Sequence, residues 1–180
     1  MSETLKKIWS NRELRTRSLV TLATLFIFRL VAHITVPGVN TEAIRSVFAS
    51  NELLGLLDIF SGGTLANFSI LALGLGPYIN ASIIMQVMTM AIKKLEELQK
   101  EGESGQEQIN QSTRMLAVPL ALGQSVAMYL LLNSSGLVTA SSPLELLTII
   151  TTLSAGSIFL MWLGENLTEY GIGNGMSMLI

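Results

Sequence analysis

The 180-residue sequence contains no cysteine and a single histidine, and charged residues make up only 13% of it. The lack of cysteine excludes a disulfide-stabilised scaffold, thiol chemistry and cysteine-ligated metal sites. With 11 Lys and Arg against 13 Asp and Glu, no basic excess is present to neutralise phosphates, so direct nucleic-acid recognition is not expected. Soluble domains carry about 25% charged residues. The deficit of charge, together with a mean hydropathy of +0.53, indicates a membrane protein.

Long stretches without charge mark candidate membrane spans. About 20 apolar residues in a helix cross a hydrocarbon core of ~30 Å. Four runs are long enough to be considered: residues 19–36, 68–92, 115–133 and 146–164. The first run is interrupted by Arg29 and has no small-residue cleavage site after it, so we interpret it as an uncleaved span and not as a signal peptide. The fold class expected is an all-α, polytopic bundle of transmembrane helices.

Lys and Arg are spread unevenly over the segments that join these runs. Five precede the first run and four lie in residues 93–114, whereas only Arg45 separates the first two runs and none lies in residues 133–145. Short loops rich in Lys and Arg remain in the cytoplasm. We therefore expect both termini and residues 93–114 to be cytoplasmic.

The segment 37–67 is too long for a simple turn and contains two short helical patterns. Residues 42–48 are amphipathic, and the Leu-rich residues 53–60 are too few to span a membrane. The Gly62-Gly63 pair is expected to break the second helix, because glycine permits backbone conformations that other residues resist. A re-entrant broken helix and a hairpin lying on the outer membrane surface both fit, and the pattern alone favours neither.

Glycine and proline are expected to interrupt three further places. In the second run, Gly74 and Gly76 precede Pro77, which removes a helical hydrogen bond and should bend the helix. Close helix packing by small residues and a bend that shapes a cavity are both possible roles. In residues 93–114, a charged helix with a Glu96–Lys100 pair should end at Gly102 and Gly105. The glycines at 171–175 indicate a tight turn.

No set of residues suited to catalysis is present: no carboxylate pair lies within a span, and the one histidine has no cysteine partner. We expect no enzyme activity, no metal and no cofactor.

Residues 60–86 (FSGGTLANFSILALGLGPYINASIIMQ) and 161–180 (MWLGENLTEYGIGNGMSMLI) form two long motifs. Both resemble motifs of the SecY family, the channel-forming subunits of bacterial Sec protein translocases, and the likeness extends over essentially the whole chain. The resemblance implies a multi-pass protein of the bacterial plasma (inner) membrane. Its role would be to pass unfolded secretory polypeptides across the membrane and membrane-protein segments into it. The partners implied are the SecE and SecG subunits, the motor ATPase SecA or the ribosome, polypeptides with signal sequences, and the lipid bilayer.

The resemblance also assigns roles to particular residues. Residues 53–67 would form a re-entrant plug that closes the pore from outside, which decides between the two interpretations above. The positions implied in the plug are Leu56, Ile59, Phe60, Ser61, Gly62 and Gly63. Leu75 and Ile79 would contribute to an apolar pore ring, with Gly74, Gly76 and Pro77 providing the helix bend between and beside them. A ring of branched apolar side chains excludes water yet yields to an unfolded chain.

Members of this family have ten spans in two pseudo-symmetric halves, and the present sequence ends before a fifth span. The chain is thus expected to be the N-terminal half of such a channel and to form no working pore alone. Protease-protected translocation by membranes that carry only this chain would contradict that expectation. The alternative class is a small-solute or ion transporter with a broken-helix site. Such a site would need polar or ionisable ligands at mid-membrane, and the last three runs contain no charge.

Overall fold

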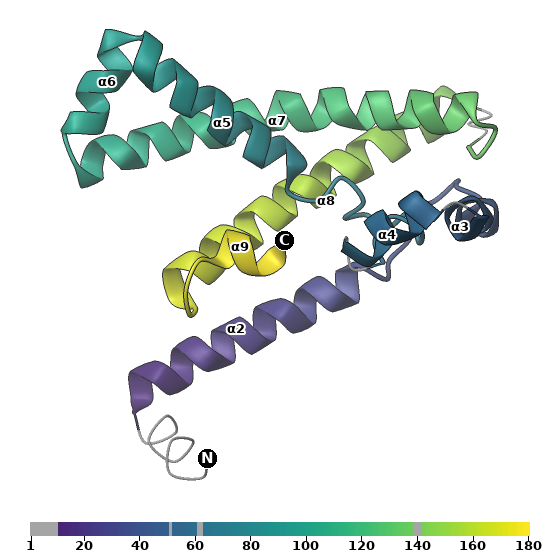
Figure 1. The fold of residues 1–180 in the computed structure, drawn as a ribbon, viewed down its shortest axis with the longest axis horizontal. Helices are drawn as coiled ribbons and strands as arrows, with labels where there is room; N and C mark the ends of the chain where they lie inside the picture. Colours follow the sequence, from purple (N-terminus) through teal and green to yellow (C-terminus); the bar gives the residue numbers. More distant parts are fainter. Residues whose placement is uncertain (1–10, 51, 61–62, 139–141) are drawn as a thin grey trace.

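The computed structural model describes residues 11–50, 52–60, 63–138 and 142–180, without the side chains of residues 54, 57 and 60. The described chain is built of α-helices joined by turns. The helices are α2 (Arg12–Val31), α3 (Thr41–Ser50), α4 (Glu52–Phe60), α5 (Gly76–Ala91), α6 (Lys93–Lys100), α7 (Glu103–Ser134), α8 (Pro143–Tyr170) and α9 (Gly175–Leu179). In Figure 1, α7 runs along one edge of the molecule. The helix α8 starts near the end of α7 and runs back diagonally through the molecule, with α2 on its other side. The helices α3 and α4 gather at one end, and α5 with α6 returns along α7 towards the other.

Polar side chains define the ends of several helices. The Asn11 side chain accepts a hydrogen bond from the Glu13 amide at the start of α2, and Asn174 does the same for the Ser177 amide in α9. Ser142 caps α8, whose first turn contains Pro143. These caps satisfy amide groups that have no partner within the helix.

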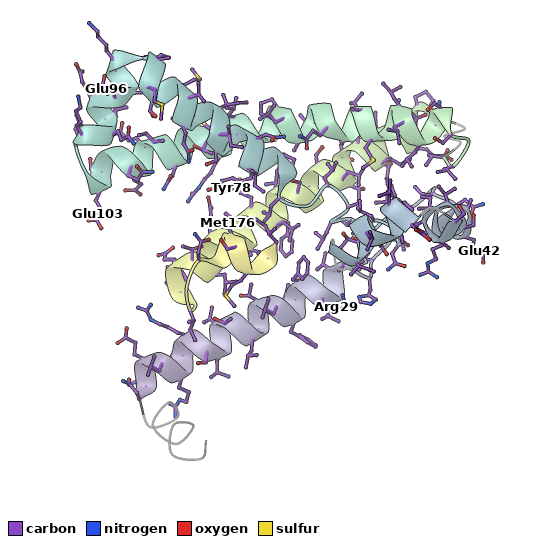
Figure 2. The ribbon with its side chains drawn as sticks, in the orientation of Figure 1. Arg29, Glu42, Tyr78, Glu96, Glu103 and Met176 are labelled. Carbon is purple, nitrogen blue, oxygen red and sulfur yellow. The ribbon has the colours of Figure 1, made fainter. Side chains whose placement is uncertain are left out.

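Three clusters of buried apolar side chains hold the helices together. The first joins α3 to the facing ends of α7 and α8 through Ile44, Leu132 and Ile149. The second joins α2, the segment before α5, α8 and α9. The third lies between α5, α7 and α8, where Tyr78 and Met176 pack against its edge (Figure 2).

Small and hydroxyl-bearing residues allow the backbones to approach closely. Ser125 of α7 and Ser154 of α8 share a buried hydrogen bond of 3.0 Å. Gly156 of α8 lies against the backbone of Ile70, where a Cβ atom would collide with the Ile70 carbonyl group. Contacts of this kind are typical of helices that associate in membranes, where apolar burial gives little driving force.

Two of the described helices, α7 and α8, are long and apolar enough to cross a membrane by length and composition. Their outward faces carry exposed apolar side chains such as Leu130 (58%) and Leu144 (74%), which suits contact with lipid. Charged side chains gather at the ends: Figure 2 places Glu96 and Glu103 at one extremity and Glu42 at the other.

The first apolar run does not match its helix along its whole length. Residues 19–36 were expected to form one span, but α2 ends at Val31 and its first turns come from the charged residues before 19. Residues 34–36 are instead paired with residues 68–70. The Val36 amide donates to the Phe68 carbonyl oxygen at 3.0 Å, and the Ile70 amide donates to the Ile34 carbonyl oxygen at 2.9 Å. Pro37 suits the pairing at Val36, because a residue directly before a proline favours the extended over the helical conformation.

The second apolar run departs further from expectation. A continuous helix over 68–92 is wrong: residues 68–75 form turns, and α5 begins only at Gly76. Pro77 does not bend a helix but lies in the first turn of α5, where its missing amide costs no helical hydrogen bond. The break itself falls at Gly74, whose φ of +58° is in the left-handed region.

The segment 93–114 forms a helical hairpin. Gly102, with a φ of +80°, ends α6 as expected, and the predicted Glu96–Lys100 ion pair is present at 2.6 Å. The expectation that Gly105 also ends a helix is wrong. Gly105 lies inside α7 at the close approach to α6, where a Cβ atom would collide with the Leu98 carbonyl oxygen. The tight turn at residues 171–174 is confirmed.

Candidate functional site

A cavity of about 340 Å³ lies where the non-helical segment 68–75 meets α2, α5, α8 and α9. Of the described residues that line it, Thr64 alone has a polar side chain. The side chains that line it include those of Phe28, Leu65, Leu75, Ile79, Leu160 and Leu179. The break before α5 therefore creates a concave apolar surface at the centre of the described fold.

Leu75 and Ile79, the two residues implied in a pore ring, both line this cavity. Leu75 is the N-cap of α5 and is only 5% exposed. Ile79 lies one turn later and is 38% exposed. The Ile79 amide donates to the Leu75 carbonyl oxygen at 2.9 Å, which fixes the two side chains on one side of the helix start. Four-residue spacing was thus sufficient to predict that they share a surface.

The three residues implied in the bend position Leu75 by different means. Gly74 supplies the left-handed turn, and its carbonyl oxygen accepts a hydrogen bond of 2.9 Å from the Ser157 hydroxyl of α8. Gly76 and Pro77 form the first turn of α5. The Gly74 carbonyl group of the break is thereby satisfied by a neighbouring helix, as backbone in an apolar environment requires.

The plug residues implied by the resemblance lie mostly outside the cavity wall. Leu56 and Ile59 of α4 are 53% and 75% exposed. The backbone of Phe60 ends α4, and Ser61 and Gly62 fall outside the described residues. Gly63 has a φ of +82°, and its amide donates to the Asp58 carbonyl at 2.9 Å. The part of this segment that reaches the cavity is Thr64 with Leu65, and a closing role for α4 stays a prediction.

Two polar contacts near these elements were missed from the sequence. Arg114 Nε of α7 lies 2.6 Å from Glu165 Oε1 of α8. A signal was available in the sequence, because Arg114 directly precedes one uncharged run and Glu165 directly follows the next. In two neighbouring antiparallel helices these positions lie at the same end. Arg45 of α3 donates from Nε to Asn67 Oδ1 at 3.1 Å. No sequence pattern pointed to this second contact, since the partners lie on separate irregularly joined segments.

The arrangement offers shape and apolarity in place of reactive groups. Among the described residues, no three His, Cys, Asp or Glu side chains are grouped as metal ligands. The residues that line the cavity carry no ionisable side chain. Such a surface can exclude water and accommodate varied side chains.

Comparison with known proteins identifies close relatives. The SecY family model matches residues 69–180. The chain is 48% identical over 158 residues to the protein translocase subunit SecY of Pseudomonas aeruginosa, covering 87% of this chain and 36% of that protein. It is 41% identical over 184 residues to the Staphylococcus carnosus subunit of the same name, covering the whole chain and 43% of the relative. The chain thus spans about two-fifths of the length of these curated relatives.

A solved structure shares the fold. The Sec61 chain in the canine ribosome-channel complex from the endoplasmic reticulum superimposes with a TM-score of 0.58 at 18% identity, over 92% of this chain and 35% of that one. An all-helical membrane bundle with this arrangement is therefore common to both. Because the family model covers more than half of the residues and the relatives align along nearly the whole chain, the protein belongs to the SecY family.

Proposed function

We propose that this chain forms the pore-lining and plug-bearing part of a channel for unfolded secretory polypeptides, which also releases membrane-protein segments into the lipid. The observation that carries the proposal is the apolar cavity at the break before α5, with Leu75 and Ile79 one turn apart in its wall. A constriction of branched apolar side chains hinders water and ions, yet it makes no fixed polar contacts that an extended chain would have to break. Membership of a family whose relatives are named protein translocase subunits supports this role.

The relatives are more than twice as long as this chain, so the remainder of the pore wall in this proposal comes from residues outside it. The channel performs no reaction of its own. Energy would come from a partner, either the SecA motor or the ribosome, and the SecE and SecG subunits would complete the assembly. The canine neighbour belongs to a ribosome-channel complex, which supports the ribosome as one such partner.

We place the protein in the bacterial inner membrane with its N-terminus in the cytoplasm. Support comes from the Lys and Arg residues, which are concentrated before and within the first turns of α2, and in α6 and the first half of α7. The transporter alternative gains no support, because the described cavity wall offers no charged ligand for an ion or polar solute.

The proposal is tested with a chimera in which this chain replaces the matching segment of the Pseudomonas aeruginosa relative. The chimera is reconstituted in lipid vesicles with its partner subunits and SecA. We expect a secretory polypeptide with a signal sequence to become protected from added protease, as with the parent channel. Correct insertion of the chimera without any protected polypeptide would contradict the proposal. Vesicles that carry the 180-residue chain alone serve as the comparison.

A further inference from the structure

A charged side chain of α3 is bonded to the segment that follows α4. Arg45 donates from Nε to Asn67 Oδ1 at 3.1 Å, and its Nη2 donates to the same oxygen. Asn67 uses its other side-chain atom at the same time, since Nδ2 donates to the Gly63 carbonyl oxygen at 2.7 Å. One guanidinium therefore holds a residue that in turn fixes the turn after α4.

The Arg45 side of this contact is anchored in the body of the protein. The preceding residue, Ile44, has no exposed surface and packs in the cluster that contains Leu132 of α7 and Ile149 of α8. Phe48, one turn further on, packs against the same cluster. The buried side of α3 thus packs on the ends of α7 and α8, and Arg45 extends from this helix.

The Asn67 side belongs to a unit that has several hydrogen bonds of its own. The carboxylate of Asp58 in α4 accepts a hydrogen bond of 2.8 Å from the Ala66 amide. The backbone carbonyl oxygen of Asp58 accepts a second one, of 2.9 Å, from the Gly63 amide. These bonds join α4 and residues 63–67 into what we call the plug unit. Its apolar side chains at Leu53 and Ile59 are 73% and 75% exposed, and α4 packs against α3.

The plug unit also forms part of the cavity wall. Thr64 and Leu65 line the cavity together with Leu75 and Ile79. Immediately after the unit, Phe68 is buried and its backbone is paired with Val36. Its φ of +42° is in the left-handed region, which is uncommon for a residue other than glycine. Two backbone hydrogen bonds join the unit to this segment, because the Phe68 amide donates to the Leu65 carbonyl oxygen and the Ser69 amide donates to the Thr64 carbonyl oxygen, each at 2.9 Å.

We propose that Arg45 is a positioning residue whose bond to Asn67 latches the plug unit to α3 beside the cavity, and that breaking this bond lets the unit move away. Packing between α3 and α4, which is close where Gly55 meets the Phe48 carbonyl, also keeps the unit near the body. The consequence for channel opening rests on the proposed function, whereas the latch itself does not.

The latch is tested by hydrogen exchange on the 180-residue chain in lipid nanodiscs. The amides of Ala66, Phe68 and Ser69 are suitable reporters, because each donates a hydrogen bond within this region. A hydrogen bond from a charged donor is strong enough that Arg45→Ala should speed their exchange by about three- to tenfold. Asn67→Ala should do the same, and the double variant should be no faster than the faster single one. Arg45→Lys, which keeps a cationic donor, should restore most of the protection.

The matched control is Arg17→Ala, since Arg17 bonds to Glu13 at 3.1 Å within α2 and is remote from the plug unit in the sequence. This variant should leave exchange at residues 66–69 unchanged. Exchange in α7 and α8 reports whether each variant remains folded, and Arg45→Met, which keeps the aliphatic chain but has no donor, replaces Arg45→Ala in the cycle if the alanine variant unfolds. Unchanged exchange at residues 66–69 in both Arg45 variants, or effects of Arg45→Ala and Asn67→Ala that multiply in the double variant, would overturn the latch.

The second arm places Arg45→Ala in the chimera described above and measures ion leakage through the resting channel. Release of the plug unit should raise the leakage, and Arg45→Lys should lower it again. If the amides exchange faster but the chimera transports no polypeptide, the latch is supported and the proposed channel is overturned. Faster exchange in a chimera that transports protein normally, with no change in leakage, would overturn the link between the latch and closure.

Discussion

Glycine in the long apolar helices has two different roles, depending on what faces it. Gly156 of α8 lies where the backbone of Ile70 crosses, and a Cβ atom there would collide with the Ile70 carbonyl group. Gly123 of α7 faces open space, with nothing within 4 Å of a Cβ atom. The close approach at Gly156 holds the non-helical segment 68–75 against α8 and so supports the cavity wall.

We therefore predict that Gly156→Ala lowers the free energy of unfolding in detergent by about 1–3 kcal/mol, because the added methyl group forces the two backbones apart. Gly123→Ala, the matched control, should stay within about 1 kcal/mol of the wild type, since it gains helix propensity without a clash. Equal effects of the two substitutions would show that the approach at Gly156 does not support the fold.

The two ion pairs with the same N–O distance should differ in strength. Arg114–Glu165 joins α7 to α8, and the Glu165 side chain is 20% exposed. Glu96–Lys100 lies within α6, with exposed fractions of 48% and 71%. A double-mutant cycle with glutamine at both positions should give a coupling of about 0.5–1 kcal/mol for the first pair and about 0.3 kcal/mol or less for the second. A larger coupling within α6 would contradict this order.

At the scale of elements, local pattern predicted the helices well and the break poorly. The amphipathic residues 42–48 lie in α3, the Leu-rich residues 53–60 lie in α4, and the last two apolar runs lie within α7 and α8. The position of the break before α5 depends on contacts between residues far apart in the sequence. Residues 68–70 pair with residues 34–36, and the Gly74 carbonyl is bonded to Ser157, 83 residues away. An apolar composition is compatible with either conformation, so the sequence could not reveal this pairing.

Two glycines beside the break allow a test of its geometry. Gly74 has a φ of +58°, which an alanine adopts only at a cost of about 1–2 kcal/mol. Gly76 lies in the first turn of α5, and a Cβ atom there would meet Gln124 Oε1 at an ordinary 3.6 Å. Thermal unfolding should therefore show a loss of stability for Gly74→Ala and almost none for Gly76→Ala. The reverse order would place the break elsewhere.

At the scale of the whole molecule, motif resemblance supplied what local chemistry could not. The spacing of Leu75 and Ile79 predicted that they share a side, and both line one cavity, whereas the pore-ring role that the motif implied stays a prediction. The contacts of Arg45 with Asn67 and of Arg114 with Glu165 were not predicted. Both depend on how separate helices are brought together, and single charged residues next to apolar runs were used only to infer orientation.

That orientation can be tested directly, since the chain has no cysteine of its own. Ser104 lies at the start of α7 in the segment expected in the cytoplasm, and Ser135 is the exposed C-cap at the other end of α7. In cells, an impermeant maleimide added from outside should label Ser135→Cys and spare Ser104→Cys until the membrane is opened. Labelling of both from outside, or of Ser104→Cys alone, would contradict the proposed topology.

In the proposed function, Leu75 and Ile79 line a path for the polypeptide, and a photo-crosslinker at position 79 of the chimera tests this placement. Ile84 is the matched control, because it is the same residue type on the same helix with nearly the same exposure, 39% against 38%, and it is not part of the cavity wall. With a secretory chain stalled in transit, we predict strong adducts from position 79 and few from position 84. A chimera that transports the chain but gives no adduct at 79, or equal adducts at both positions, would contradict the account.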